Sequence, residues 1–223
     1  MPYFIFIVNP AAGKGLHTES LCAKIHRYFS ARNMGFEIHL TTGPQDAFQF
    51  VQSYPRQKEG AQICFVACGG DGTLHEVVNG AAKRSDCTVA VIPCGSGNDY
   101  VKNFGSADAF TDLERLVQGA PRPVDLLDCS GEYAVNLCNI GFDARVAHHM
   151  SKFKRIPFVS GPLAYTLSLL FCILGPISST MAISCHGRET VVEKLVLAVI
   201  ANGFCYGGGY YRVPEACTAD GVR

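Results

Sequence analysis

Short apolar runs alternate with segments of helical spacing as far as residue 121. The apolar runs, which predict strands, cover residues 3–8, 63–68 and 88–92, and apolar and polar positions alternate over 36–40. Apolar residues three to four positions apart predict helices over residues 17–33, 45–54, 74–83 and 109–117. Strands that alternate with helices favour a parallel sheet covered by helices on both faces.

The pattern changes after Pro121-Arg122-Pro123. Two pairs of short apolar runs flank turn signals at Ser130-Gly131 and His186-Gly187, and each pair predicts a β-hairpin. The paired runs are residues 124–129 with 134–139, and 181–185 with 195–201. Helical spacing over residues 144–174 separates the pairs. We therefore expect an α/β domain over residues 1–122 and a mainly antiparallel β domain with a helical insertion over residues 123–223.

The most apolar segment is Pro162–Leu174. It is shorter than the roughly 20 residues that a bilayer-spanning helix needs. We expect a buried helix, and a helix in contact with lipid is the alternative.

Composition narrows the class of protein. The 223 residues are 48% hydrophobic and 17% charged, with 19 basic and 19 acidic side chains. This balance gives no global electrostatic argument for nucleic-acid binding. Eleven cysteines without a Cys-x-x-Cys pair favour free, mostly buried thiols in a reducing compartment, so we expect a cytoplasmic protein.

Three glycine-rich turns each follow a predicted strand. They are residues 9–15, 69–73 and 93–99. The carboxyl ends of parallel strands meet at one edge of a sheet, where α/β proteins bind ligands. Glycine turns that lead into helices present backbone N–H groups to phosphate, so the three turns predict a phosphate site.

Asp71 stands inside the central turn, Gly69-Gly70-Asp71-Gly72-Thr73. A carboxylate beside phosphate is unfavourable unless it serves a metal, a hydroxyl or a ribose, so its presence favours phosphoryl chemistry. A simple strand–helix turn is the alternative, but that interpretation gives Asp71 no structural task. Asn98-Asp99 is expected to cap a helix, to contact a ligand, or both.

Known nucleotide fingerprints are absent. The chain has no G-x-x-x-x-G-K-[ST] motif, and neither Gly70-x-Gly72 nor Gly95-x-Gly97 has the third glycine of the dinucleotide fingerprint. Protein-kinase motifs are also missing.

The segments around these turns resemble the diacylglycerol kinase catalytic-domain family, which includes bacterial lipid kinases and sphingosine kinases. The similarity runs in the family's order along essentially the whole chain. The matching stretches are Asn9-Pro10-x-x-Gly13, Gly69-Gly70-Asp71-Gly72-Thr73, His75-Glu76-Val77-Val78-Asn79-Gly80, Pro93-x-Gly95-Ser96-Gly97-Asn98-Asp99, Val124-Asp125, Asn139-x-Gly141-Phe142-Asp143, Gly207-Gly208-Gly209 with Pro214, and Asp220-Gly221. Gly-Gly-Asp-Gly is shared with NAD kinases and phosphofructokinases, whereas the Pro93–Asp99 stretch favours the lipid kinases.

The resemblance implies a Rossmann-like, three-layer α/β domain of the NAD kinase and phosphofructokinase type and a C-terminal β-sandwich. It implies ATP and Mg²⁺ as cofactors and transfer of the ATP γ-phosphate to a lipid alcohol such as diacylglycerol. Asp71 would be catalytic and Asp220 would hold magnesium. The residues that would line the nucleotide are Asn9, Pro10, Ala11, Ala12, Gly13, Thr41, Gly69, Gly70, Asp71, Gly72, Thr73, Glu76 and Ser96.

The family pattern continues for about 60 to 90 residues beyond Arg223, with the acidic motif that carries the expected proton acceptor. The sandwich is thus expected to be incomplete at residue 223. Two alternatives stay open: a catalytically incomplete nucleotide- or lipid-binding remnant, and a soluble-substrate kinase of the NAD kinase type.

The expected partners are ATP, a lipid alcohol and a membrane surface that the protein contacts peripherally, in a role in phospholipid biosynthesis. Lys152, Lys154 and Arg155 could face anionic headgroups, and a solvated basic face is the alternative. No nucleic acid is expected, and a homodimer is left open.

Overall fold

The computed structural model describes residues 2–15, 18–56, 62–153, 156, 159, 161–184, 191–206, 210–211 and 216–219. The chain forms two compact units, Met1–Asn136 with Ala201–Arg223, and Leu137–Ile200. The domain boundary expected after residue 122 stays a prediction.

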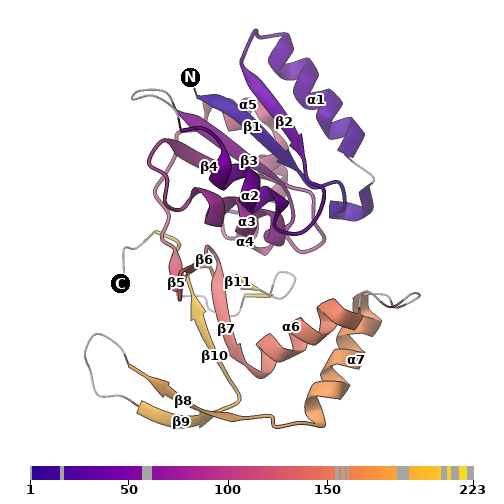
Figure 1. Ribbon diagram of the computed structural model, residues 1–223, viewed down its shortest axis with the longest axis vertical. Helices are drawn as coiled ribbons and strands as arrows, with labels where there is room; N and C mark the ends of the chain where they lie inside the picture. The colour runs from indigo at the N-terminus through magenta and orange to yellow at the C-terminus, as the bar shows by residue number, and fades with distance from the viewer. Residues whose placement is uncertain are drawn as a thin grey trace. The chain divides into compact units, whose positions relative to one another are not determined.

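The first unit contains a four-stranded parallel sheet, which confirms the predicted α/β class (Figure 1). Its strands are β1 (Tyr3–Val8), β2 (Phe36–Leu40), β3 (Ile63–Gly69) and β4 (Cys87–Pro93), in the order β2-β1-β3-β4. All seven residues of the central strand β3 are buried. Such continuous apolar runs are typical of a strand that is covered on both faces.

Helices cover both faces of this sheet. Side chains of α1 (Thr18–Ser30) and α5 (Leu113–Gln118) pack on one face against Phe4, Phe6 and Val66. Side chains of α2 (Asp46–Ser53), α3 (Asp71–Ala81) and α4 (Asp99–Lys102) pack on the other against Ile5 and Phe65. Alternate residues of each strand thus feed two separate cores in a three-layer arrangement.

The helix predicted over residues 109–117 is wrong as a single element. The structure has a 3₁₀ turn, η2 (Ala107–Thr111), followed by α5. Asp112 separates them because its Oδ1 accepts hydrogen bonds from Glu114 N at 2.9 Å and Arg115 N at 3.4 Å. This N-cap needs extended backbone at Asp112, and helical spacing of apolar residues does not reveal it.

A hairpin formed by β5 (Leu127–Cys129) and β6 (Glu132–Ala134) confirms the turn predicted at Ser130-Gly131. Asn79 of α3 holds this hairpin in place. Its Nδ2 donates to Tyr133 O, and its Oδ1 accepts from Tyr133 N, both at 2.8 Å. The first unit also contains the 3₁₀ turn η1 (Ala12–Gly15) and the short pair β11 (Cys205–Tyr206) and β12 (Tyr210–Tyr211).

The described residues of the second unit form two strand pairs and two helices. Strand β7 (Leu137–Gly141) pairs with β10 (Leu197–Ala201), and β8 (Ser179–Ile183) pairs with β9 (Val191–Leu195). The prediction that residues 195–201 pair with 181–185 is therefore wrong, and the proposed turn itself lies outside the described residues. A complete β-sandwich stays a prediction.

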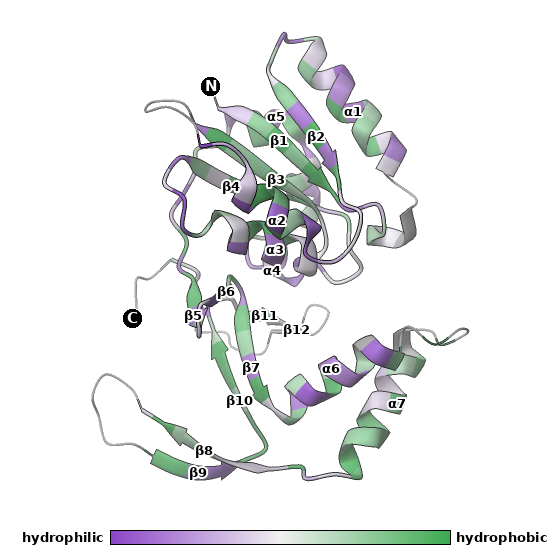
Figure 2. Ribbon diagram, viewed as in Figure 1, coloured by the Kyte–Doolittle hydropathy of each residue, from purple (hydrophilic) through white to green (hydrophobic). Residues whose placement is uncertain are grey.

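Helices α6 (Phe142–Phe153) and α7 (Gly161–Ile173) pack against each other in this unit (Figure 1). The prediction that residues 162–174 form a buried helix is wrong, because most sides of the helix are exposed. Among the side chains of this helix that the structure describes, only the small Ala164, Ser168 and Cys172 are fully buried, whereas large apolar side chains are exposed. Figure 2 shows that most of α7 is hydrophobic. In the part of the chain that is described, no helix is both long and apolar enough to cross a membrane.

Candidate active site

The three glycine turns lie at the carboxyl ends of β1, β3 and β4, within the first unit. Asn9 Nδ2 donates to Thr73 Oγ1 at 3.0 Å, which links the first turn to the second. Cys94 N donates to Gly69 O at 2.8 Å, which links the third turn to the second. Hydrogen bonds therefore hold the three turns together at one edge of the sheet.

Gly70 and Gly95 make the closest approach between two of these turns. A Cβ added to Gly95 would lie 2.4 Å from Gly70 Cα, a distance that real Cβ atoms do not tolerate. Gly95 therefore needs glycine because backbone meets backbone there, whereas a Cβ at Gly70 would lie 3.3 Å from Gly95 Cα, a tight contact.

The first turn folds around Asn9. Its Oδ1 accepts from Ala11 N at 3.0 Å, its carbonyl accepts from Ala12 N at 3.1 Å, and Gly13 adopts a positive φ of 58°. The side chain that links this turn to Thr73 therefore also sets its shape.

The N-terminus of α3 is open in the second turn. Gly70 occupies the N-cap position and has no side chain that could cap the helix. A Cβ added to Gly72 would meet nothing within 4 Å. Uncapped N–H groups and the helix dipole attract an anion, and the space over Gly72 lets it approach the backbone.

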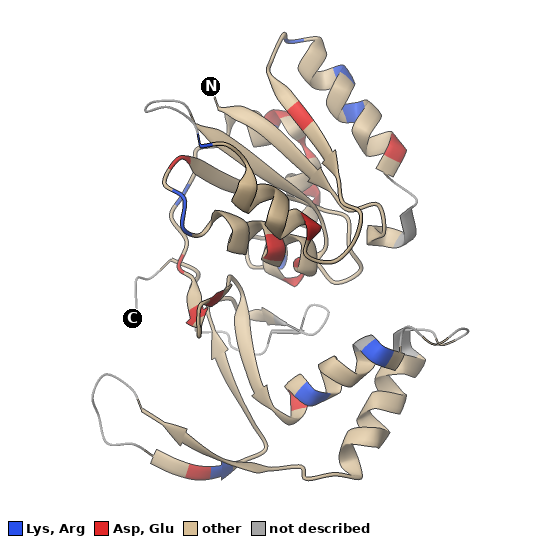
Figure 3. Cartoon of the chain, viewed as in Figure 1, with Lys and Arg blue, Asp and Glu red and all other residues tan. Residues whose placement is uncertain are grey.

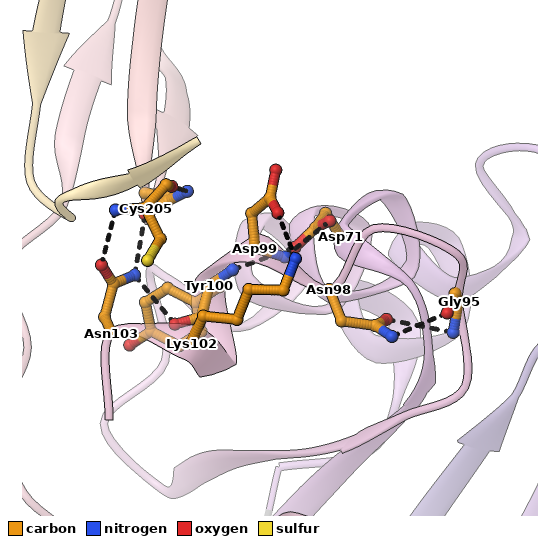
Figure 4. A network of polar contacts seen from close by, with 9 residues as sticks. Asp71, Gly95, Asn98, Asp99, Tyr100, Lys102, Asn103 and Cys205 are labelled. Carbon is orange, nitrogen blue, oxygen red and sulfur yellow. Dashed lines mark hydrogen bonds and ion pairs between the residues drawn. The ribbon is translucent and has the colours of Figure 1, made fainter. Parts of the chain in front are cut away.

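Asp71 has a structural task that the sequence did not reveal. Its Oδ2 accepts from Asp99 N at 3.1 Å and its Oδ1 accepts from Tyr100 N at 3.2 Å (Figure 4). The carboxylate thus caps α4, and the expectation that it has no structural need is wrong. A carboxylate has about four acceptor sites, so both oxygens retain capacity for a cation or a hydroxyl.

Asn98 does not act as the predicted side-chain cap of α4. It adopts left-handed backbone with φ of 52°, and its side chain turns back to Gly95 instead. Asn98 Nδ2 donates to Gly95 O at 2.7 Å, and Oδ1 accepts from Gly95 N at 3.0 Å (Figure 4). Ser96 lies in the loop that this contact closes. Asp99 Oδ1 meanwhile pairs with Lys102 Nζ at 2.8 Å.

A polar cluster after β2 was missed by the sequence analysis. Asp46 Oδ2 accepts from Thr42 N and Thr42 Oγ1, both at 2.6 Å, and Asp46 Oδ1 lies 2.9 Å from His39 Nε2. The Thr42 hydrogen bonds, with His39, lower the pKa of Asp46 to about 2. The cluster fixes the turn that contains Thr41, whose N–H donates to Val8 O at 2.9 Å. The Thr-x-x-x-Asp spacing before a helix was the available signal.

We predict that Asp46 makes stability depend on pH. Its pKa is about 2 in the fold against an ordinary value of 3.8, so its charged form stabilises the native state. That contribution, about 1–2 kcal/mol for a partly screened group, is complete above about pH 4 and is lost as pH falls toward 2. Urea unfolding of the wild type and Asp46→Asn should show a stability difference at pH 7 that shrinks at pH 3. A pH-independent difference would contradict this assignment.

Glu76 lies next to the start of α2. Its Oε1 accepts from Gln45 N at 3.0 Å, where Gln45 has a positive φ of 69°. This contact joins α3 to the turn after β2, and the predicted nucleotide contact of Glu76 stays a prediction.

Asp220, Gly207–Gly209 and Pro214 lie outside the described residues. Among residues that are described, no three His, Cys, Asp or Glu side chains cluster as a metal site.

Two asparagines, also missed from sequence, tie α4 to the segment before Gly207. Asn103 Oδ1 accepts from Phe204 N at 2.8 Å and Cys205 N at 3.1 Å, and its Nδ2 donates to Tyr100 O at 2.8 Å (Figure 4). Asn136 receives a further bond from Asn103 Nδ2 at 3.0 Å, and its own Nδ2 donates to Cys205 O at 2.9 Å.

We predict that Asn202→Ala lowers the free energy of unfolding by about 2–3 kcal/mol, because it leaves buried carbonyls unpaired. Asn202 is 4% exposed, and its Nδ2 donates to Asp125 O at 2.7 Å and Val135 O at 2.8 Å. Gln52→Ala, at an exposed position of α2, is the control and should cost nothing. Equal stability of the two variants in urea unfolding would contradict the prediction.

Comparisons with known proteins agree with this geometry. Residues 3–129 match the family model of the diacylglycerol kinase catalytic domain. The diacylglycerol kinase of Bacillus subtilis (strain 168) is 32% identical over 97% of this chain and 70% of the relative. A solved diacylglycerol kinase from Bacillus anthracis str. Sterne aligns with a TM-score of 0.71 at 26% identity, over 98% of this chain and 70% of that one.

The chain belongs to the diacylglycerol kinase catalytic domain family, and it is an enzyme of the lipid kinase type. The resemblance inferred from the glycine turns is thereby confirmed.

Proposed function

We propose that this protein transfers the γ-phosphate of ATP to the hydroxyl of diacylglycerol or a related lipid alcohol, with Mg²⁺ as cofactor. The observation that carries the proposal is the convergence of three glycine turns on the open N-terminus of α3, with Asp71 among them. Family membership supports a lipid alcohol over NAD as acceptor.

The backbone provides most of the proposed chemistry. Phosphoryl transfer is catalysed mainly by positioning and by neutralising charge on the transferred group. The uncapped N–H groups of α3 would donate to phosphate oxygens above Gly72, where the structure leaves space. Asn9 and Thr73 hold the first turn against this helix end, so the donors are fixed before the nucleotide binds.

Asp71 fits a magnesium ligand. Mg²⁺ is usually held by one or two carboxylates together with substrate phosphates, and the capping bonds to α4 leave acceptor sites on both Asp71 oxygens. When bound, Mg²⁺ would supply positive charge to the phosphate oxygens. The two backbone donors fix the direction of the carboxylate. In the proposed reaction Asp71 would also accept the proton of the lipid hydroxyl.

The kinase reaction can be tested with γ-labelled ATP and the intact chain. Diacylglycerol and sphingosine in mixed micelles, and NAD in solution, would be offered as acceptors. We expect a labelled phospholipid from diacylglycerol that depends on Mg²⁺. Labelled NAD alone would identify a soluble-substrate kinase, and no labelled product despite ATP binding would identify a binding remnant.

Peripheral membrane association in the cytoplasm and a role in phospholipid biosynthesis follow from this reaction as part of the proposal. A kinase whose acceptor resides in a bilayer must reach the bilayer surface.

A further inference from the structure

Two acidic residues are joined where the second and third glycine turns meet. Asp71 Oδ2 accepts from Asp99 N at 3.1 Å, and a Cβ added to Gly97 would lie 3.1 Å from the same oxygen. The two turns, residues 69–73 and 93–99, contain both carboxylates and no Lys or Arg. Since like charges repel, two uncompensated carboxylates at this edge of the sheet would oppose the binding of a triphosphate.

Lys102 provides a compensating cation from the last residue of α4. Its Nζ lies 2.8 Å from Asp99 Oδ1, and its side chain runs back along the helix to make this contact (Figure 4). Helices α3 and α4 together carry Asp71, Glu76 and Asp99, and Lys102 is their only Lys or Arg (Figure 3). Lys102 is therefore the one cation that these two helices contribute beside their carboxylates.

The ion pair is partly shielded from water. The side chain of Asp99 is 15% exposed and that of Lys102 is 30% exposed. Cys205 is 1% exposed and lies within electrostatic range of both charges: burial raises the pKa of its thiol most, Asp99 raises it further, and Lys102 lowers it. Charges beside buried groups are screened less than charges on an open surface, so the charge of Asp99 would act strongly on its surroundings if Lys102 were removed.

Helix α4 does not depend on this ion pair to hold its ends. Asp71 accepts two backbone N–H groups at the start of the helix, and Asn103 donates to Tyr100 O at its end. An ion pair between residues three positions apart on a helix adds only a small stabilisation. The pair is therefore better explained by its charge than by the stability of the helix.

We propose that Lys102 is a positioning residue of the nucleotide site, whose ammonium group neutralises Asp99 and so lowers the repulsion that the triphosphate meets beside Asp71. Lys102 acts through Asp99 and does not itself contact phosphate. The carboxylate of Asp71 is then the one left to Mg²⁺, which Asp99 would otherwise attract as well. The inference rests on the proposed ATP site and adds to it a residue outside the three glycine turns.

Calorimetric titration of ATP with Mg²⁺ into the intact wild type and Lys102→Met tests this role. We expect the variant to bind ATP about tenfold more weakly, and ADP to lose less affinity than ATP because it carries one negative charge fewer. Mg²⁺ alone should bind the variant at least as tightly as the wild type, since the unpaired carboxylate attracts a cation. Raising the salt from about 0.1 M to about 1 M should reduce the difference in ATP affinity.

Two further variants separate charge from structure. Lys102→Arg keeps the cation and should bind ATP within about twofold of the wild type. Asp99→Asn/Lys102→Met removes both charges and should regain most of the lost affinity. The matched control is Lys24→Met on α1, which removes a lysine that donates to Thr111 O at 2.8 Å, and it should bind ATP like the wild type.

Unchanged ATP affinity in Lys102→Met would overturn the proposal. A parallel loss of ATP and Mg²⁺ affinity would also overturn it, because that result would assign Lys102 a structural role. No recovery in Asp99→Asn/Lys102→Met would mean that Lys102 contacts phosphate itself or that ATP binding needs the carboxylate of Asp99, and either meaning contradicts the proposal.

Assays of phosphoryl transfer on the same proteins distinguish this inference from the proposed reaction. ATP binding that depends on Lys102 in a protein that phosphorylates no acceptor would support the inference and refute the reaction. Transfer by a wild type whose ATP affinity equals that of Lys102→Met would refute the inference alone. No binding of ATP to the wild type would refute both.

Discussion

Asp71→Asn is expected to lower turnover of the kinase reaction by about a thousandfold, the range found when a proton acceptor or charge-stabilising group is removed. The amide keeps one acceptor oxygen for the backbone donors of Asp99 and Tyr100 and loses the negative charge. We therefore expect the free energy of unfolding to fall by only about 1 kcal/mol, the typical cost of a weakened cap. Steady-state kinetics and urea unfolding measure the two effects.

Asp112→Asn is the matched control. Asp112 also accepts two backbone N–H groups, from Glu114 and Arg115, and caps α5 away from the glycine turns. It should lose similar stability and keep its turnover. Full turnover in Asp71→Asn, or an equal loss in both variants, would show that Asp71 only caps α4.

Gly95→Ala is expected to damage both the fold and the reaction. The new Cβ would lie 2.4 Å from Gly70 Cα, so two turns must separate. Overpacking of this kind costs about 1–3 kcal/mol of stability. A displacement of about 1 Å at a phosphate site costs about a hundredfold in turnover, and we expect that loss here.

Gly72→Ala is the control for the stability effect. Its Cβ meets nothing within 4 Å, and alanine is favoured over glycine in a helix by up to about 1 kcal/mol, so the fold should be equally or more stable. A Gly95→Ala protein as stable as Gly72→Ala would contradict the close approach of the turns.

Local patterns in the sequence predicted the parallel sheet and the position of the turns. Apolar runs such as residues 63–68 and the glycines that follow them are short-range signals, and the topology of parallel strands brings their ends together. The signal that predicted the hairpin at Ser130-Gly131 was also short-range.

Contacts between distant residues could not be predicted in this way. Asp71 caps a helix that begins 28 residues later, and Asn103 receives N–H groups from Phe204 and Cys205 about a hundred positions further on. Nothing in the neighbouring sequence distinguishes such side chains from surface polar residues. One side chain can therefore have two roles, because a carboxylate that is positioned for a ligand can also accept hydrogen bonds from backbone N–H groups.

Two wrong predictions, the pairing of β8 and the burial of α7, were based on apolar composition alone. Strand β8 pairs with Val191–Leu195, while residues 197–201 pair with β7, and apolar runs alone do not fix which runs become partners. Helix α7 looked like a core helix because its composition is apolar, but composition does not say which face packs against the protein and which is exposed.

Calorimetric titration of Mg²⁺ and ATP into the wild type and Gly72→Ala tests most directly whether the three glycine turns form the nucleotide site. The added methyl group would occupy the space above the N-terminus of α3, where it meets no atom within 4 Å, so we expect the fold to be unchanged. We predict saturable binding to the wild type and an affinity at least about tenfold lower in Gly72→Ala, since even a single lost charge-assisted hydrogen bond to phosphate accounts for that factor. Equal affinity in the two proteins, or no binding to the wild type, would contradict the account.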